Sequence, residues 1–133
     1  MRVLTENLML GDWVCASDGE MPTGPIQIEG ITTEQIMSGG NVYRTDTVQG
    51  IALTDTRLEH NGFVRMVLNG RTFYVSPDEK HKNEVTIIED DCQGMKTYWY
   101  ATDMPIMPTV RLRHLSDLQH ALRMDGKMLE VRP

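Results

Sequence analysis

Short runs of alternating hydrophobic and polar residues recur along most of this chain, and this period of two is typical of half-buried β-strands. The runs predict strands at residues 13–14, 25–31, 42–45 and 48–53. Residues 17–24 are polar and rich in glycine and proline, so they are expected to form a loop. Residues 32–38 fit either a single helical turn or a further strand.

The middle of the chain carries the clearest local signals. Thr54 can cap the first turn of a short helix, and Asn61-Gly62 supplies the left-handed residue that ends one. Two apolar runs at residues 64–68 and 72–75 then flank Asn69-Gly70. Asn-Gly provides both positive-φ residues of a type I′ turn, so a β-hairpin is predicted here.

Two more strands are predicted at residues 85–88 and 95–102, joined by an acidic turn at Glu89-Asp90-Asp91. Proline at positions 105 and 108 interrupts regular structure after them.

A helix is predicted at about residues 113–124, because apolar residues recur there at helical spacing and form one buried stripe. The stripe consists of Leu115, Leu118, Ala121 and Leu122. Asp125-Gly126 is expected to end this helix, and residues 128–131 are expected to return as a strand beside a sheet edge.

These elements predict an α+β fold that is mostly antiparallel β-sheet. We expect an SH3-like barrel or curved sheet at the N-terminus and a C-terminal helix packed on a second sheet. The 133 residues fit a single domain, 1–133. A subdivision into a small β-barrel-like part, 1–53, and an α+β part, 54–133, is the alternative.

Charge and composition narrow the classes of function. Thirteen basic and nineteen acidic side chains give a net charge of −6, which argues against a groove for a nucleic-acid backbone. No run approaches the eighteen or so apolar residues that span a bilayer, and the first residues do not resemble a signal peptide. Cys15 and Cys92 lie far apart, without metal-ligand or disulfide-framework spacing. A cytoplasmic protein is therefore expected.

No pattern of catalytic, cofactor-binding or metal-binding residues is found. His114 and His120 are six positions apart and face different sides of a helix, so they cannot chelate one ion. Glu89-Asp90-Asp91 could ligate a cation, but it lacks the alternating spacing of a calcium loop, so a charged turn is favoured. Phosphate-binding and serine-nucleophile motifs do not occur.

Tyr98, Trp99 and Tyr100 are the candidate binding-surface residues. Along a strand Trp99 points away from the two tyrosines, so one of the two faces is a candidate for exposure. An exposed tyrosine pair would suit protein recognition, whereas packing in the core is the structural alternative.

Three landmarks extend over most of the chain: Leu10-Gly11-Asp12-Trp13-Val14, the segment from Gly50 to Phe63, and Leu115 to Leu129. In order and spacing they resemble a family of small Bacteroidetes proteins that are often encoded in prophages or conjugative elements. Ser116 stands where that family commonly has histidine, so a function that needs the histidine would not transfer. The family has no assigned activity, and the resemblance implies a cellular context only.

Three hypotheses follow. The leading one is a non-enzymatic accessory or protein-binding module from a mobile element, with no cofactor and with a protein as partner. The first alternative is a small metal-dependent hydrolase that uses Glu89-Asp90-Asp91 with a histidine. The second is a nucleic-acid-binding small barrel, which the acidic balance makes the least favoured. The sequence leaves the oligomeric state open.

Overall fold

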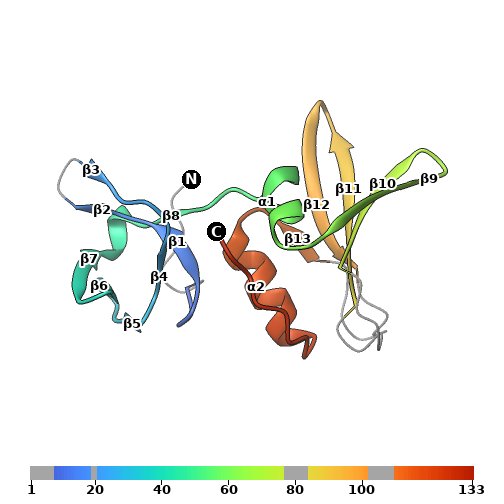
Figure 1. Cartoon of the computed structure of the whole chain (residues 1–133). Helices are drawn as coiled ribbons and strands as arrows, with labels where there is room; N and C mark the ends of the chain where they lie inside the picture. Colours follow the sequence, from blue (N-terminus) through green and yellow to red (C-terminus); the bar gives the residue numbers. More distant parts are fainter. Residues whose placement is uncertain (1–7, 19–20, 77–83, 102–109) are drawn as a thin grey trace. The chain divides into compact units, whose positions relative to one another are not determined.

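The fold is α+β, with mostly antiparallel sheets and a C-terminal helix, as the sequence predicts. The computed structural model describes residues 8–18, 21–76, 84–101 and 110–133 (Figure 1). The contacts of the chain divide it into two compact units. The first consists of Met1–Ala52 with His114–Ser116 and Pro133, and the second of Leu53–Arg113 with Asp117–Arg132.

The first unit is built from very short strands in three small antiparallel sheets. One sheet has the order β4-β1-β8, with β1 Trp13–Cys15, β4 Ile26–Gln27 and β8 Gln49–Gly50. The second sheet pairs β2 Ser17–Asp18 with β3 Met21–Pro22. The third has the order β5-β6-β7, with β5 Gly30–Ile31, β6 Gln35–Ser38 and β7 Asn41–Arg44. A 3₁₀-helix at Thr45–Thr47 follows it. Within the described residues these strands form no closed barrel, so the structure does not support the SH3-like alternative.

The predicted strand at residues 25–31 is two strands, β4 and β5, that belong to different sheets. Ile28 lies between them, buried, and its N–H donates to the Asp12 carbonyl at 2.9 Å, while the Glu29 N–H donates to Met37 at 2.8 Å. The backbone therefore changes partners at this point. The predicted loop at residues 17–24 contains the β2–β3 pair, and residues 35–38 of the ambiguous segment form strand β6.

A close approach of backbone to side chain joins distant parts of the first unit. A Cβ atom added at Gly50 would lie 2.5 Å from ring atoms of His114. Ala52 forms an isolated antiparallel bridge with His114, and the Leu115 N–H donates to the Ile51 carbonyl at 2.8 Å. His114 therefore has a packing role against the chain at residues 50–52.

The second unit contains one five-stranded antiparallel sheet with the order β13-β12-β11-β10-β9. Its strands are β9 Val64–Leu68, β10 Arg71–Ser76, β11 Val85–Cys92, β12 Met95–Ala101 and β13 Val110–Leu112. Helix α1, Asp55–His60, and helix α2, Leu115–Met124, lie on one side of this sheet (Figure 1).

Two predicted local signals in this unit are confirmed. The Thr54 hydroxyl accepts a hydrogen bond from the Arg57 N–H at 3.2 Å, which caps α1. Asn69 and Gly70, with φ of 52° and 76°, form the turn between β9 and β10. Both signals are local, so tertiary contacts did not override them.

The predicted acidic turn is wrong. Glu89, Asp90 and Asp91 continue strand β11, where they pair with residues of β12. The turn lies at Gln93-Gly94 instead, with φ of 53° and 80°. Both residues take the left-handed conformation that a two-residue hairpin needs, and glutamine is an unusual choice for the first of them.

The C-terminal helix begins at Leu115 rather than 113, and its predicted apolar stripe is buried. The strand expected at residues 128–131 does not form. The end of the chain is held instead by a side chain: Asn61 accepts from the Arg132 N–H at 2.7 Å and donates to the Arg132 carbonyl at 2.9 Å. This amide therefore satisfies both backbone groups of Arg132, the residue that follows the expected strand.

The register of the five strands sorts their side chains onto two faces, because directly opposed residues in an antiparallel pair share a face. Tyr74 opposes Ile87, and Ile87 opposes Tyr100; Glu89 opposes Tyr98. We call this the tyrosine face. On the other face Met66, Phe73, Ile88 and Trp99 form one row across four strands, and we call it the open face.

Candidate functional site

The three aromatic residues singled out in the sequence fall on opposite faces of the sheet, as their alternation requires. Tyr98 and Tyr100 are buried, with 6% and 0% of their surface exposed. The exposed tyrosine pair considered from the sequence is therefore corrected to its alternative, core packing. Trp99 is half-buried on the open face, and its Nε1–H donates to Thr97 Oγ1 at 3.2 Å.

A polar cluster connects the tyrosine face to the first turn of α1. The Tyr98 hydroxyl donates to Asp55 Oδ1, and Lys96 Nζ lies 2.7 Å from Asp55 Oδ2. The same ammonium group lies 2.8 Å from Glu89 Oε1. The Tyr74 ring meets the Tyr98 ring edge-on, with centroids 6.3 Å apart and planes at 64°.

The surroundings of these groups move their pKa values away from neutral pH. Burial alone would raise the pKa of Asp55, but hydrogen bonds from Lys96 and Tyr98 outweigh it and lower that pKa. Burial and the nearby Asp55 carboxylate raise the pKa of Tyr74 to about 12, and the same two causes raise the pKa of Tyr98 further. Hydrogen bonds to Asp55 and Glu89 raise the pKa of Lys96.

The pKa shifts favour a structural role for this cluster over a role in acid–base catalysis. A general acid or base works best with a pKa near the operating pH, and here the carboxyl pKa moves down while the tyrosine and lysine pKa values move up. The Tyr100 hydroxyl acts in the same way at α2, donating to Asp125 Oδ2 at 2.6 Å. These contacts fasten both helices to the tyrosine face.

Sequence reasoning missed this cluster. Asp55 is an acid in the first turn of α1, and its partner Tyr98 lies 43 positions away. No spacing rule relates two residues at that separation. The sequence offers one signal for this cluster, namely an acidic residue on a short predicted helix and tyrosines on a predicted strand.

The three consecutive acids do not converge on one point. Glu89 and Asp91 project from the tyrosine face, whereas Asp90 projects from the open face, because alternate residues of a strand point to opposite sides. Glu89 is already paired with Lys96, whose positive charge opposes a cation there. Among the described residues, no three histidine, cysteine or acidic side chains group as metal ligands.

A groove of about 440 Å³ lies where the turns of the β9–β10 and β11–β12 hairpins meet. Three basic and three acidic side chains line it: Arg65, Arg71, Lys96, Glu89, Asp90 and Asp91. Their formal charges cancel, so the groove has no net charge to attract an ionic ligand.

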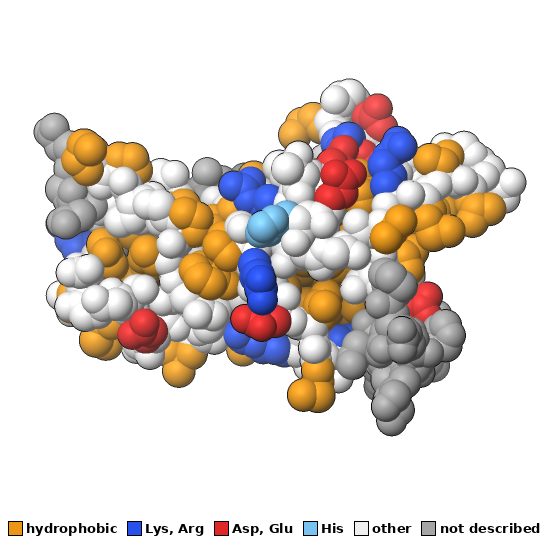
Figure 2. Space-filling view, viewed as in Figure 1, with side chains coloured by type: hydrophobic (Ala, Val, Ile, Leu, Met, Phe, Trp, Pro, Cys, Tyr) orange, Lys and Arg blue, Asp and Glu red, His pale blue; other side chains and the backbone are white. Residues whose placement is uncertain are grey.

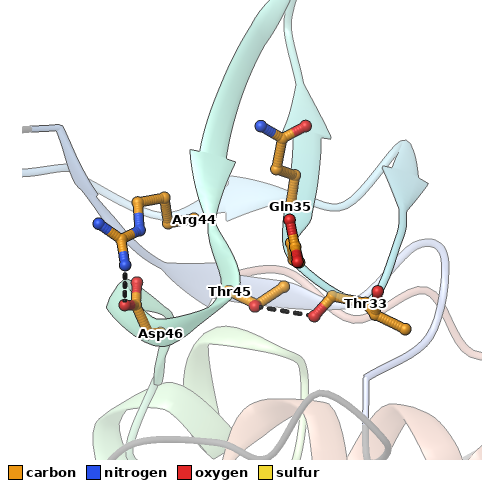
Figure 3. Close-up of a pocket in the computed structure, with 6 residues that line it drawn as sticks. Thr33, Gln35, Arg44, Thr45 and Asp46 are labelled. Carbon is orange, nitrogen blue, oxygen red and sulfur yellow. Dashed lines mark hydrogen bonds and ion pairs between the residues drawn. The ribbon is translucent and has the colours of Figure 1, made fainter.

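The first unit has a hollow of about 460 Å³ beside β6 and β7 (Figure 3). Its polar groups bond to one another: Arg44 Nη2 lies 2.6 Å from Asp46 Oδ2, and Thr45 Oγ1 donates to the Thr33 carbonyl at 3.2 Å. The arginine side chain is 76% exposed, and a salt bridge so accessible to water orders its surroundings only weakly. Arg44, Asp46 and Thr45 therefore already use polar groups on one another or on the backbone, which leaves those groups less available to a ligand.

The open face carries a row of exposed and half-buried apolar side chains. Val64, Met66 and Leu68 are 53%, 45% and 55% exposed. Phe73, Val75, Ile88 and Trp99 continue this surface across the sheet, half-buried. Hydrophobic side chains gather along the β9–β10 hairpin in Figure 2. Both helices are fastened to the tyrosine face, so neither covers this row.

Cysteine and histidine side chains complete the set of residues that could carry chemistry. Cys15 is a free cysteine in β1 and is not part of a disulfide. His81 lies outside the described residues, as does the side chain of Cys92.

Comparison of the chain with family models, with curated proteins and with solved structures finds no match. In the described part of the chain, neither helix has the length and apolar character needed to cross a lipid bilayer.

Proposed function

We propose that this chain is a non-enzymatic, protein-binding accessory module and that the open face of its five-stranded sheet is the binding surface. The observation that carries the proposal is the apolar row Met66, Phe73, Ile88 and Trp99, which neither helix of the unit covers. Aromatic residues and methionine are enriched in the cores of protein interfaces, where they supply most of the contact energy.

The size of the row suits a protein partner better than a small molecule. Five strands spaced about 4.8 Å apart, each contributing about five residues, give a face of roughly 24 by 17 Å. That whole face of about 400 Å² contains the apolar row and its polar margin, and exposed apolar patches of a few hundred Å² on monomers are often functional. A small ligand would need a concave pocket to bury most of its surface, and this face is the surface of a sheet.

Polar residues at the margin agree with this proposal. Arg71, Asp90 and Arg111 share the open face and lie around its apolar row. A rim of charged residues around an apolar centre is the usual anatomy of a protein interface. The resemblance to mobile-element proteins of Bacteroidetes supports a host or element protein as the partner.

The test is affinity capture from the native cytoplasm with three forms of the full chain. Val64 on β9 and Val42 on β7 are both strand valines, 53% and 56% exposed. Val64→Lys should lose the captured protein at least tenfold, whereas Val42→Lys should keep it. The proposal fails if wild type captures no specific protein, or if both variants capture it equally.

A metal-dependent hydrolase is not favoured, because Glu89 and Asp91 project from the opposite face to Asp90. An SH3-like, nucleic-acid-binding barrel would need a basic, aromatic-lined groove. The groove between the two hairpins has as many acids as bases and no aromatic side chain among its described lining residues.

A further inference from the structure

We infer that two copies of this chain pair through β9, antiparallel and edge to edge, with Met66 on the twofold axis. Strand β9 is the last strand of the sheet in the described part of the chain. Exposed sheet edges are usually protected by proline, a bulge or several charges. Val64-Arg65-Met66-Val67-Leu68 has no proline, pairs with β10 without interruption and has one charge.

The hydrogen-bonding groups of the edge alternate in a way that fits this pairing. Leu68 and Arg71 flank the two-residue turn, and in such hairpins this pair exchanges both hydrogen bonds. By alternation, Met66 and Val64 also bond toward β10. The N–H and C=O groups of Arg65 and Val67 therefore point outward, available to a further strand.

Strand length and charge together select one register, because an axis at Val67 would pair only Met66 to Leu68 within the strand. A twofold axis at Met66 places Arg65 opposite Val67 of the second copy and Val64 opposite Leu68, so every direct pair contains an apolar residue. An axis at Arg65 would set the two guanidinium groups directly opposite each other, which is destabilising. The axis at Met66 also uses the outward groups of Arg65 and Val67 for hydrogen bonds across the interface.

The area predicts a weak dimer. The four apolar side chains of β9 are 45–57% exposed. Pairing covers the sides of these side chains that point toward the second copy and leaves their outer faces exposed, so it removes less than about 400 Å² per copy, under half of the ~800 Å² per partner that stable complexes bury. The pairing is therefore expected to be reversible and concentration-dependent. It joins two open faces into one continuous apolar surface, whatever protein that surface binds.

The test is disulfide trapping of the full chain, with Cys15→Ala and Cys92→Ser as background. In Met66→Cys the two introduced cysteines lie directly opposite each other as a non-hydrogen-bonded pair. Their Cα atoms are about 4.5 Å apart, a distance that a disulfide can bridge. Val64→Cys is the control, because the two copies of position 64 would lie about 13 Å apart along the strand. Met66→Cys should cross-link at least tenfold more than Val64→Cys.

A second change separates pairing from chance collisions. Val67→Pro removes an outward N–H that β10 does not use, so the sheet should remain while cross-linking at Met66→Cys falls at least tenfold. In sedimentation, the mass of the wild type should rise above 15.1 kDa with concentration, and that of Val67→Pro should not.

Equal cross-linking at positions 64 and 66, or a wild-type mass that stays at the monomer value at millimolar concentration, would overturn the inference. A peptide or another protein on β9 would give the second result. Neither readout requires the partner of the open face, so this result is independent of the capture experiment.

Discussion

Replacing Leu118 with alanine tests which side of the five-stranded sheet is the core. Leu118 lies on α2 and has none of its surface exposed. The change removes three carbon atoms, worth about 2.4 kcal/mol at ~0.8 kcal/mol per buried CH₂ group. A residual cavity of about 50 Å³ adds roughly 1.2 kcal/mol. The free energy of unfolding should therefore fall by about 3–4 kcal/mol.

The same change on the open face is the matched control. Leu68 is 55% exposed, so it loses little contact with apolar neighbours when it is truncated. Leu68→Ala should reduce the free energy of unfolding by less than about 1 kcal/mol, as for most surface substitutions. The difference between the two leucines is then a direct measure of the difference between the two faces.

Urea unfolding, followed by tryptophan fluorescence, is the assay. Trp13 lies in the first unit and Trp99 in the second, so a Trp13→Phe background reports on the second unit alone. Midpoint and slope give the free energy for each variant. A loss under 1 kcal/mol for Leu118→Ala, or an equal loss for both leucines, would refute the assignment of the helix-covered face as the core.

Three further outcomes are expected. Tyr98→Phe removes the hydrogen bond to the helix α1 carboxylate and should lower the free energy of unfolding by about 1–2 kcal/mol in urea titration; no change would contradict the fastening role. The pKa of Tyr74 is raised to about 12 from 10.0, so the folded state favours its neutral form. Its contribution to stability is complete below pH 10 and is lost as the pH rises toward 12. Alkaline unfolding followed by circular dichroism should show this loss. A stability that does not depend on pH in this window would argue against the shift. Gly50→Ala should lower the midpoint of thermal unfolding because the new Cβ would lie 2.5 Å from the His114 ring, whereas Gly24→Ala meets nothing within 4 Å and should not.

The sequence predicted the elements whose signals are local. The cap at Thr54, the turn at Asn69-Gly70 and the leucine stripe of α2 are each encoded within one or two turns of chain. The α+β class followed from these and from the alternation of apolar residues.

The sequence could not locate features that depend on distant partners. Charge usually marks loops, so the acidic residues at 89–91 predict a turn, but Lys96 and the β12 backbone stabilise them in a strand. The 128–131 segment has a strand-like composition, yet it forms no strand, and Asn61 binds the backbone of the next residue, Arg132. The alternation of side chains along β12 predicted that Trp99 and the two tyrosines project from opposite faces of the sheet. It did not show which of the two faces the helices cover.

The most direct test of the proposed binding surface uses Trp99 as its own reporter. In Trp13→Phe protein, fluorescence emission is measured as the captured partner is added, with acrylamide as a quencher. Binding at the open face should shift the Trp99 emission to shorter wavelength and protect it from quenching. Saturable binding that leaves both the emission and the quenching unchanged would show that the partner binds elsewhere.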